Sequence, residues 1–569
     1  MKRNHIMLAT VLALILAAVA VTGIVLATPT GEAIITYPYD GMQVNGKLQI
    51  KCDAVVTSPK FAFYKVEFSL GDAKPTGWGA VTTPQSTVPA DGVCATWDTT
   101  KFPNGPAYLK LTVVDNTSNY IEDTIKVIIN NGASAVGTDT CKACHTEAYA
   151  AWEKTKHGAN KIGCETCHGP GGTHVAMGGD KAYIDKVYAA AQCGTCHKEV
   201  FAEWEKSAHN NHPDVAEFGR SPCFSCHTAQ GYIAVQYEGD AKYAGSYHYE
   251  GQTCAACHNP HSAKNETQLR FVETSKLPSG TVVNVGLAAN CANCHNQRRI
   301  PTDIAAQVST AFGRGPHEGT STEMLTANDA VDWDKYTYPS SPHKDVVKDS
   351  CVTCHMNPEG AKGAQHAMEP QLAACQTCHG ANVANFEFKA KADYDGNGEV
   401  GTVEEEVEGL MKLLEAKLPP TTTGWLNDKK LDTPAKRGAA YNWLFVERDW
   451  SKGIHNTLYA VAILQASYKE VTGQDVPGAT IVYKEGVAAP AAQAPAAQAP
   501  AQAPAQAPAQ APAPATTQTA AGGPPNIPAN HPTAGCAVCH STGAAGAPKF
   551  PANHATFAEA QCSTCHKPK

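Results

Sequence analysis

The pattern Cys-x-x-Cys-His occurs ten times in this chain and takes up twenty of its 22 cysteines. Two thiols at this spacing fit the two vinyl groups of one porphyrin, and the adjacent histidine then supplies a nitrogen to the iron. A single copy also fits a zinc knuckle or a redox pair, but ten copies indicate covalent c-type haem attachment. The predicted attachment residues are Cys141, Cys144, His145; Cys164, Cys167, His168; Cys193, Cys196, His197; Cys223, Cys226, His227; Cys254, Cys257, His258; Cys291, Cys294, His295; Cys351, Cys354, His355; Cys375, Cys378, His379; Cys536, Cys539, His540; and Cys562, Cys565, His566.

Eight of the motifs lie between Cys141 and His379. This density leaves little room for a conventional side-chain core, so we expect the porphyrins to form most of the core. The sequence predicts an octahaem domain over residues 134–392, with a helical C-terminal part over residues 405–486.

Histidines outside the motifs are the candidate second axial ligands of the irons. An internal repeat identifies two of them: the run from Cys141 to His157 matches the run from Cys193 to His209, with Trp and the extra His at the same offsets. A short helix at this spacing carries the extra histidine towards a neighbouring iron, while individual pairings stay open. The predicted distal ligands are His157, His174, His209, His248, His261, His317, His343, His366, His455, His531 and His554.

The segment before the motifs has a different pattern. Short β-rich runs at 32–37, 48–56, 61–70, 108–114 and 121–129 are separated by Asp-Gly and Asn-Gly turn signals. They predict a β-sandwich over residues 31–132. The run Trp97-Asp-Thr-Thr100, followed by residues 108–115, resembles bacterial Ig-like domains. Cys52 and Cys94 are the two cysteines outside the motifs, and an oxidising compartment favours a disulfide between them, with two free thiols as the alternative.

The N-terminus indicates export. A positive start is followed by an uncharged apolar stretch from Met7 to Ala27, so residues 1–30 are either a cleaved signal peptide or a retained membrane anchor. Both place the chain outside the cytoplasm. The formal net charge of −8 argues against nucleic acid and favours redox partner proteins or extracellular electron acceptors.

Several motif contexts carry a family resemblance. The runs Cys-His-Gly-Pro-Gly-Gly-Thr-His174, Cys223-Phe-Ser-Cys-His-Thr-Ala-Gln-Gly231, Cys254-Ala-Ala-Cys-His-Asn-Pro-His261 and Ser341-Pro-His-Lys followed by Cys351-Val-Thr-Cys-His-Met356 resemble the superfamily of octahaem hydroxylamine oxidoreductase, octahaem tetrathionate reductase and ammonia-forming nitrite reductase. The resemblance implies that the octahaem domain has a mostly α-helical, loop-rich fold around closely stacked haems. Those nitrite reductases commonly hold the catalytic haem on Cys-x-x-Cys-Lys. All ten motifs here end in histidine, which argues against nitrite reduction of that type.

An EF-hand-like calcium loop is predicted over residues 393–404. The run from Asp393 to Glu404 fits D-x-[DN]-x-[DN]-G-x5-E. The predicted ligands of one structural calcium ion are Asp393, Asp395, Asn397, Glu399 and Glu404. The alternative is a solvated acidic turn.

Residues 487–525 are built on Ala-Gln-Ala-Pro, a composition that favours an extended polyproline II spacer. Beyond this linker, residues 526–569 carry the last two motifs with His531 and His554. This segment is too short for an independent side-chain core, so we expect a small dihaem electron-transfer domain on a tether.

Three functions fit this organisation. The first is multi-step electron transfer through a decahaem cytochrome, with every iron six-coordinate. The second is a multihaem oxidoreductase in which one iron lacks a distal ligand and binds a small nitrogen or sulfur compound, with Arg298 and Arg299 as candidate proton donors. The third is a cytochrome filament whose subunits share ligands. The sequence favours the first.

Overall fold

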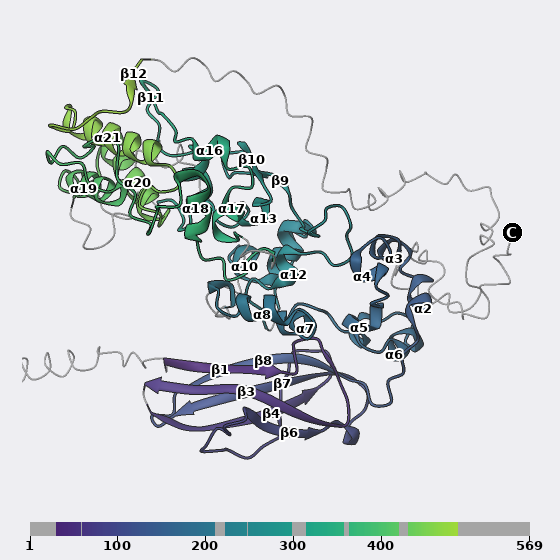
Figure 1. The fold of residues 1–569 in the computed structure, drawn as a ribbon. Helices are drawn as coiled ribbons and strands as arrows, with labels where there is room; N and C mark the ends of the chain where they lie inside the picture. Colours follow the sequence, from purple (N-terminus) through teal and green to yellow (C-terminus); the bar gives the residue numbers. More distant parts are fainter. Residues whose placement is uncertain are drawn as a thin grey trace, which may run out of the picture. The chain divides into compact units, whose positions relative to one another are not determined.

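The computed structural model describes residues 30–486, with gaps at 59, 211–221, 247, 299–314, 358–362 and 420–430. A strand-rich segment comes first and a helical, loop-rich segment follows (Figure 1). The predicted export segment, the Ala/Pro/Gln linker and the dihaem segment with His531 and His554 lie outside the described residues, as does Arg299.

The strand-rich segment contains two sheets. One has the strand order β1-β3-β6, and the other has the order β2-β8-β7-β4-β5. Pairing is antiparallel except between β2 and β8. The strands are β1 Thr30–Tyr37, β2 Gln43–Val44, β3 Lys47–Ser58, β4 Phe61–Leu70, β5 Gly79–Ala80, β6 Val93–Asp98, β7 Gly105–Asp115 and β8 Tyr120–Ile129. The five predicted runs became β1, β3, β4, β7 and β8, while β2, β5 and β6 lacked a predicted run.

One hydrophobic core joins the two sheets. Ile50 and Trp97 of the smaller sheet pack in the same cluster as Val66 and Leu111 of the larger one. Alternation along β4 accounts for this, because Tyr64 and Val66 are buried while Lys65 and Glu67 are less so. The predicted disulfide between Cys52 and Cys94 is present within this core. Closing a loop between cysteines 42 positions apart stabilises the segment by about 4 kcal/mol in the chain-entropy model.

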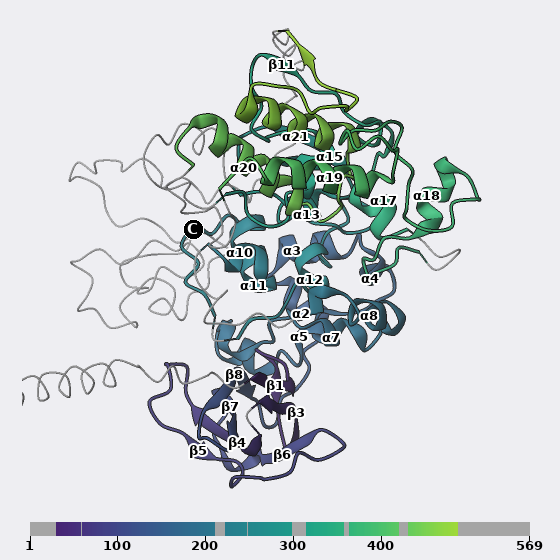
Figure 2. The ribbon, with the colours of Figure 1, turned by 90° about the vertical axis from the view of Figure 1, so that its left-hand side faces the viewer.

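The haem-motif region is made of short helices joined by loops (Figure 2). The helices on which the eight described motifs lie are α2 Thr138–Lys142, α5 Cys164–His168, α7 Ala190–Gly194, α10 Phe224–His227, α12 Cys254–Cys257, α13 Ala289–Ala292, α17 Cys351–His355 and α18 Leu372–His379. Between them lie α3 Thr146–Trp152, α4 Lys156–Ala159, α6 Gly172–Ala176, α8 Lys198–Trp204, α11 Ala229–Gly231, α15 Ser321–Thr326 and α16 His343–Val346. Two small antiparallel sheets of two strands each are also present, β9 Glu273–Lys276 with β10 Val282–Gly286 and β11 Tyr336–Thr337 with β12 Lys484–Glu485.

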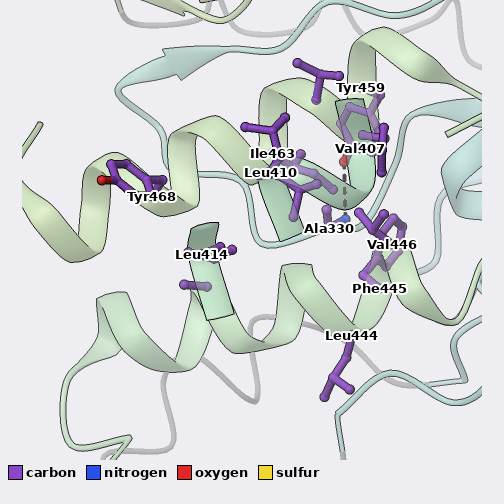
Figure 3. Close-up of a cluster of buried hydrophobic side chains, with 14 of the residues drawn as sticks. Ala330, Val407, Leu410, Leu414, Leu444, Phe445, Val446, Tyr459, Ile463 and Tyr468 are labelled. Atoms are coloured by element: carbon purple, nitrogen blue, oxygen red, sulfur yellow. Dashed lines mark hydrogen bonds between the residues drawn. The ribbon is translucent and has the colours of Figure 1, made fainter. Parts of the chain in front are cut away.

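Three longer helices end the described chain. They are α19 Val403–Glu415, α20 Pro434–Glu447 and α21 Thr457–Thr472. Apart from the first two residues of α19, they lie in the helical part predicted over residues 405–486. Thr402 caps α19 in a reciprocal arrangement with Glu405, and Thr433 caps α20. Buried side chains such as Leu410, Phe445 and Ile463 form the core between the three helices (Figure 3).

These two side-chain cores lie at opposite ends of the described sequence. Between them the motif region has only small buried clusters among the described residues, the larger of which contains Leu277, Val285 and Ala289. This distribution agrees with the expectation that haem fills most of the space there. A membrane-spanning helix needs about 20 mostly apolar residues, and none of the helices within the described ranges meets that requirement.

The strand-rich segment contacts the start of the motif region directly. The amide of Gln43 donates to Asp185 Oδ1 at 2.7 Å, and the Gln43 side chain donates to the carbonyl of His168 at 3.2 Å. Thr173 Oγ1 donates to Asn130 Oδ1 at 2.6 Å. The strand-rich segment therefore docks against the second haem motif and the residues that follow it.

Candidate functional site: paired histidines at the haem motifs

Each of the eight described motifs folds as one helical turn. The amide of the motif histidine donates to the carbonyl of the first motif cysteine at 2.9 Å in the first motif, 3.0 Å in the third and 2.8 Å in the sixth, for His145, His197 and His295. The turn keeps both thiols and the imidazole together, which fits attachment of one porphyrin. One turn offers the iron a single imidazole, so the opposite axial position depends on another segment of the chain.

Every described motif histidine has its ring next to that of one histidine from outside the motifs. The ring centroids lie between 5.9 and 6.3 Å apart. The eight pairs, in motif order, are His145 with His174, His168 with His261, His197 with His157, His227 with His317, His258 with His366, His295 with His209, His355 with His455, and His379 with His343.

This separation is the one that a shared iron requires. A metal–imidazole nitrogen bond is about 2 Å long, and the ring centre lies about 1 Å beyond the nitrogen, so two imidazoles on opposite sides of one iron have centroids about 6 Å apart. Imidazoles in van der Waals contact would lie closer than this if stacked. The residues present therefore fit one haem between the members of each pair.

In six of these rings a hydrogen bond at Nδ1 determines which nitrogen points to the partner histidine. Nδ1 of His168 faces the carbonyl of Asp185 at 2.9 Å, and Nδ1 of His174 faces that of Asp180 at 2.9 Å. The same arrangement holds for His258 with Thr267, His317 with Glu318, His355 with Met368 and His366 with Ala364, at 2.7 to 3.0 Å. A carbonyl accepts a proton from Nδ1, which leaves the Nε2 lone pair for a metal.

Burial keeps several of these imidazoles neutral. Burial and the facing imidazole of His168 lower the pKa of His261 to about 4, and burial with His209 lowers the pKa of His295 to about 4. A neutral imidazole is the form that binds a metal. These side chains are therefore ready to coordinate at neutral pH.

His455 has a different hydrogen-bond partner. Its Nδ1 lies 2.6 Å from Oδ1 of Asp449, a side chain with no exposed surface. Burial lowers the pKa of His455, but the carboxylate of Asp449 outweighs this effect and raises the pKa overall. Asp449 stands six positions before His455, and no motif in this stretch predicts the contact.

His248, a predicted distal ligand, is placed elsewhere. Its Nδ1 lies 3.0 Å from Oδ1 of Asp123 on β8, its Nε2 lies 3.5 Å from Glu250 Oε1, and it stands in none of the eight pairs. Both ring nitrogens thus face carboxylates, which is the physical reason that this geometry does not support ligation. Burial lowers the pKa of His248, but the two carboxylates raise it well above its ordinary value. His248 instead links the motif region to the sandwich.

Neighbouring motifs touch one another. Helices α2 and α5 of the first two motifs are in contact, as are α7 and α12 of the third and fifth, and α17 and α18 of the seventh and eighth. Gln192 Nε2 of α7 donates to the carbonyl of Cys167 at 2.5 Å, which joins the second and third motifs.

The sixth motif lies at a branch. Cys294 packs in one cluster with Ala256 of the fifth motif, and Cys226 of the fourth motif lies 3.9 Å from the carbonyl of Asn293. On its other side, Cys291 packs with Cys351 of the seventh motif. Arg298 follows the sixth motif and lies close enough to the fourth to affect it. The pKa of His227 is lowered mainly by burial, and the charges of His317 and Arg298 add to this effect.

The acidic loop forms a cluster whose last member differs from the prediction. Carboxylate oxygens of Asp393, Asp395 and Glu406 lie within 4.8 Å of one another. Glu404 instead points to Lys452, 4.0 Å away, with its side chain 41% exposed. The reason is that α19 begins only at Val403, so that the buried Glu406 turns back to the loop.

Backbone geometry within this loop matches the predicted cation loop at its start. Asp393 accepts from the amides of Gly396 and Gly398 at 2.6 and 2.8 Å, and Gly398 has a φ of +93° that favours glycine. Burial raises the pKa of Asp395, and the carboxylates of Glu406 and Asp393 add to the rise. A bound cation would relieve this repulsion.

Comparison with known proteins supports the interpretation of the motifs as haem attachment sites. A family model described as cytochrome c554 and c-prime matches residues 290–380 and 502–567. The motifs at Cys291, Cys351, Cys375, Cys536 and Cys562 fall within these two segments.

Three further similarities are to multihaem proteins. The multiheme cytochrome MtrA of Shewanella baltica is 24% identical over 221 residues, which cover 32% of this chain and 61% of MtrA. The C-type polyheme cytochrome OmcC of Geobacter sulfurreducens is 24% identical over 229 residues, 35% of this chain and 29% of OmcC. An undecaheme cytochrome from the S-layer of Carboxydothermus ferrireducens has 20% identity and a TM-score of 0.35 over 55% of this chain and 50% of its own. The matches therefore span less than two thirds of each of these proteins.

The pair of His248 and Asp123 predicts a pH dependence of stability. Because the folded-state pKa of His248 is raised, its contribution is fully present below about pH 6.5 and is lost as the pH rises through the folded-state pKa. Removal of one partner of a buried pair costs about 3 kcal/mol, so Asp123→Asn should lower the unfolding free energy at pH 6. Thermal unfolding of both proteins from pH 5 to 9 measures this, and a constant difference across that range would contradict the assignment.

Proposed function

Because the chain is a multihaem c-type cytochrome, we propose that it is a ten-haem protein that transfers electrons in several steps outside the cytoplasm. The observation that carries this proposal is the set of eight histidine pairs, one for each described motif. When bound, each haem supplies one-electron chemistry between ferric and ferrous iron.

The chain's contribution is to hold both axial positions of each iron. The motif histidine binds on one side and its pair partner on the other, with Nε2 directed to the metal wherever Nδ1 donates to a carbonyl. An iron held on both sides has no position for a substrate. This arrangement supports electron transfer over catalysis.

The motif contacts define the order of transfer. We take the path to run through the first, second, third, fifth, sixth, seventh and eighth motifs, because consecutive members of this series are in contact. The fourth motif joins as a branch at the sixth through Cys226 and Asn293. Spatial order thus departs from chain order at the fourth and fifth motifs.

Two alternatives receive less support. An oxidoreductase requires a motif histidine without a facing partner, and a filament with shared ligands requires a partner from a second chain. Within the described ranges each motif histidine meets a histidine of its own chain. In an enzyme, the fourth motif beside Arg298 would be the candidate for an iron without a distal ligand. Its histidine, His227, faces His317.

The C-terminal segment, the linker and the strand-rich segment also fit electron transfer. We propose that residues 526–569 form a dihaem head with His531 and His554 as distal ligands, and that residues 487–525 are its extended tether. The head then reaches redox partner proteins or extracellular acceptors at a distance. In the same way we assign the sandwich to the Ig-like domains and the octahaem region to the superfamily of octahaem hydroxylamine oxidoreductase, as the motif contexts suggest.

We also propose one structural calcium ion at the acidic loop. The chemistry of the donor set carries this assignment, since carboxylate and amide oxygens are the ligands that calcium prefers. Asp393, Asp395 and Asn397 supply the first ligands as predicted, with Glu399 at the seventh position. Glu406 takes the place of Glu404 as the closing carboxylate.

The ligand assignment is tested by replacing two histidines near the fifth motif. His261→Ala should open one axial position at the second motif, because His261 is the histidine that faces His168. His248→Ala is the matched control, since His248 faces carboxylates instead. The first variant should show one high-spin haem that binds carbon monoxide when reduced, and the second should show none. High-spin iron in the His248 variant, or its absence in the His261 variant, would overturn the pairing.

The calcium assignment is tested by two glutamates of one helix. Glu406→Gln should weaken calcium binding and reduce the rise in melting temperature on calcium addition, because ligand binding stabilises the folded state by mass action. Glu404→Gln should keep the full rise, since Glu404 lies beside Lys452. Differential scanning calorimetry with and without chelator measures both. An unchanged melting temperature of the unmodified protein on chelation would mean that the loop is only an acidic turn.

A further inference from the structure

The seventh haem motif differs from the others in what lies behind its distal histidine. His455, which faces His355 of this motif, directs Nδ1 at 2.6 Å to the carboxylate of Asp449. In the other pairs whose Nδ1 contacts were described above, such as His366 with the carbonyl of Ala364, the acceptor is an uncharged backbone oxygen. The carboxylate has no exposed surface, so water does not screen its charge.

The chain holds Asp449 in this position with a tight turn between α20 and α21. Trp450 and Lys452 have φ angles of 60° and 47°, and Gly453 has 94°, which is the left-handed region that favours glycine. A Cβ atom on Gly453 would lie 2.8 Å from Val407 Cγ2. The turn is therefore fixed against α19 by packing.

Ser451 ties the two functional residues of this turn together. Its hydroxyl donates to Oδ2 of Asp449 and accepts from the amide of His455 at 3.1 Å. The carbonyl of Asp449 accepts from Ser321 Oγ at 3.4 Å. Asp449 thus has one oxygen for Ser451 and the other for the His455 ring.

Other ionisable groups around this pair do not cancel its charge. Burial raises the pKa of Glu323 to about 8, with backbone hydrogen bonds opposing this and Asp329 and Asp449 adding to it, so Glu323 is neutral at pH 7. The nearby basic side chain Lys452 points to Glu408, 2.7 Å away, and is half exposed. The His455 ring is therefore the group that receives the Asp449 carboxylate most directly.

A carboxylate behind a ligating imidazole makes that ligand more basic. A more basic ligand stabilises ferric iron over ferrous iron, which lowers the reduction potential. We propose that Asp449 is a positioning residue that makes the seventh haem a low-potential step of the relay, an inference that rests on the proposed ligation of that haem by His355 and His455.

Because the seventh haem lies between two others, a low potential there would affect electron transfer to the eighth haem. The seventh motif lies between the sixth, through Cys291 and Cys351, and the eighth, through α17 and α18. If the seventh haem has the lower potential, transfer of one electron from ferrous iron at the sixth haem to ferric iron at the seventh would be uphill, and the electron would then pass to the eighth. Asp449 would therefore set the rate at which electrons reach or leave the eighth haem.

Potentiometric titration of the full-length holoprotein at pH 7 tests this inference. Asp449→Asn keeps an acceptor for Nδ1 and removes the charge, so it should shift the ferric–ferrous equilibrium of one haem at least tenfold towards ferrous, a rise of 59 mV for one electron. Asp180→Asn is the matched control, because His174 contacts the Asp180 carbonyl and not its side chain. That variant should leave every potential unchanged.

Two further variants make the outcomes distinct. His455→Ala identifies the low-spin resonance of the seventh haem by removing it, and Asp449→Asn should move that same resonance. Ser451→Ala removes the hydrogen bond donated to Oδ2 of Asp449, which makes this carboxylate a stronger acceptor for Nδ1 of His455. The variant should therefore shift the same potential in the opposite direction by a smaller factor, which keeps the test valid if Asp449→Asn fails to load haem. If His455→Ala leaves all irons low-spin, the ligation itself is wrong. If it opens one iron while neither Asp449→Asn nor Ser451→Ala shifts a potential, only this inference is overturned.

Discussion

The structure depends on a mismatch between what a haem iron binds and what one motif provides. A single helical turn supplies two thiols and one imidazole, as in α5 or α17, whereas a six-coordinate iron takes two axial ligands. In the eight described pairs the second imidazole comes from a remote segment, so a haem bound as proposed would act as a cross-link. His258 meets His366 and His355 meets His455 in this way, which ties together parts of the chain that no hydrophobic core joins.

This mode of assembly explains where the side-chain cores lie. The sandwich and the three long helices each have a full hydrophobic cluster, because neither carries a haem motif. The described motif region has helices of three to eight residues, which are too short to be stable alone in water. Their stability comes from attachment, from the facing histidine and from contacts such as that of Gln43 with Asp185.

The sequence predicted the parts of this fold that have local signals. The alternating residues 61–70 form β4, and the two cysteines outside the motifs form the disulfide. The helices that Thr402 and Thr433 cap lie in the predicted helical C-terminal part. The pairings had no local signal, because His209 and His295 meet through the tertiary fold. His248 and His261 both lie next to the fifth motif in the sequence, so both were predicted to be distal ligands. Only the fold, which places Asp123 of β8 and Glu250 beside His248, distinguishes the two. Glu406 was missed for a similar reason, since the start of α19 decides which acidic residue faces the loop.

The central claim is that every haem of this protein is held by two histidines and serves electron transfer. Quantitative electron paramagnetic resonance of the fully oxidised native protein, normalised to its haem content, tests this claim most directly. The account predicts ten low-spin ferric haems per chain, one for each motif, and no high-spin signal. A high-spin signal equal to one haem would contradict it and would point to a catalytic iron, and a total of eight haems would remove the proposed C-terminal dihaem head.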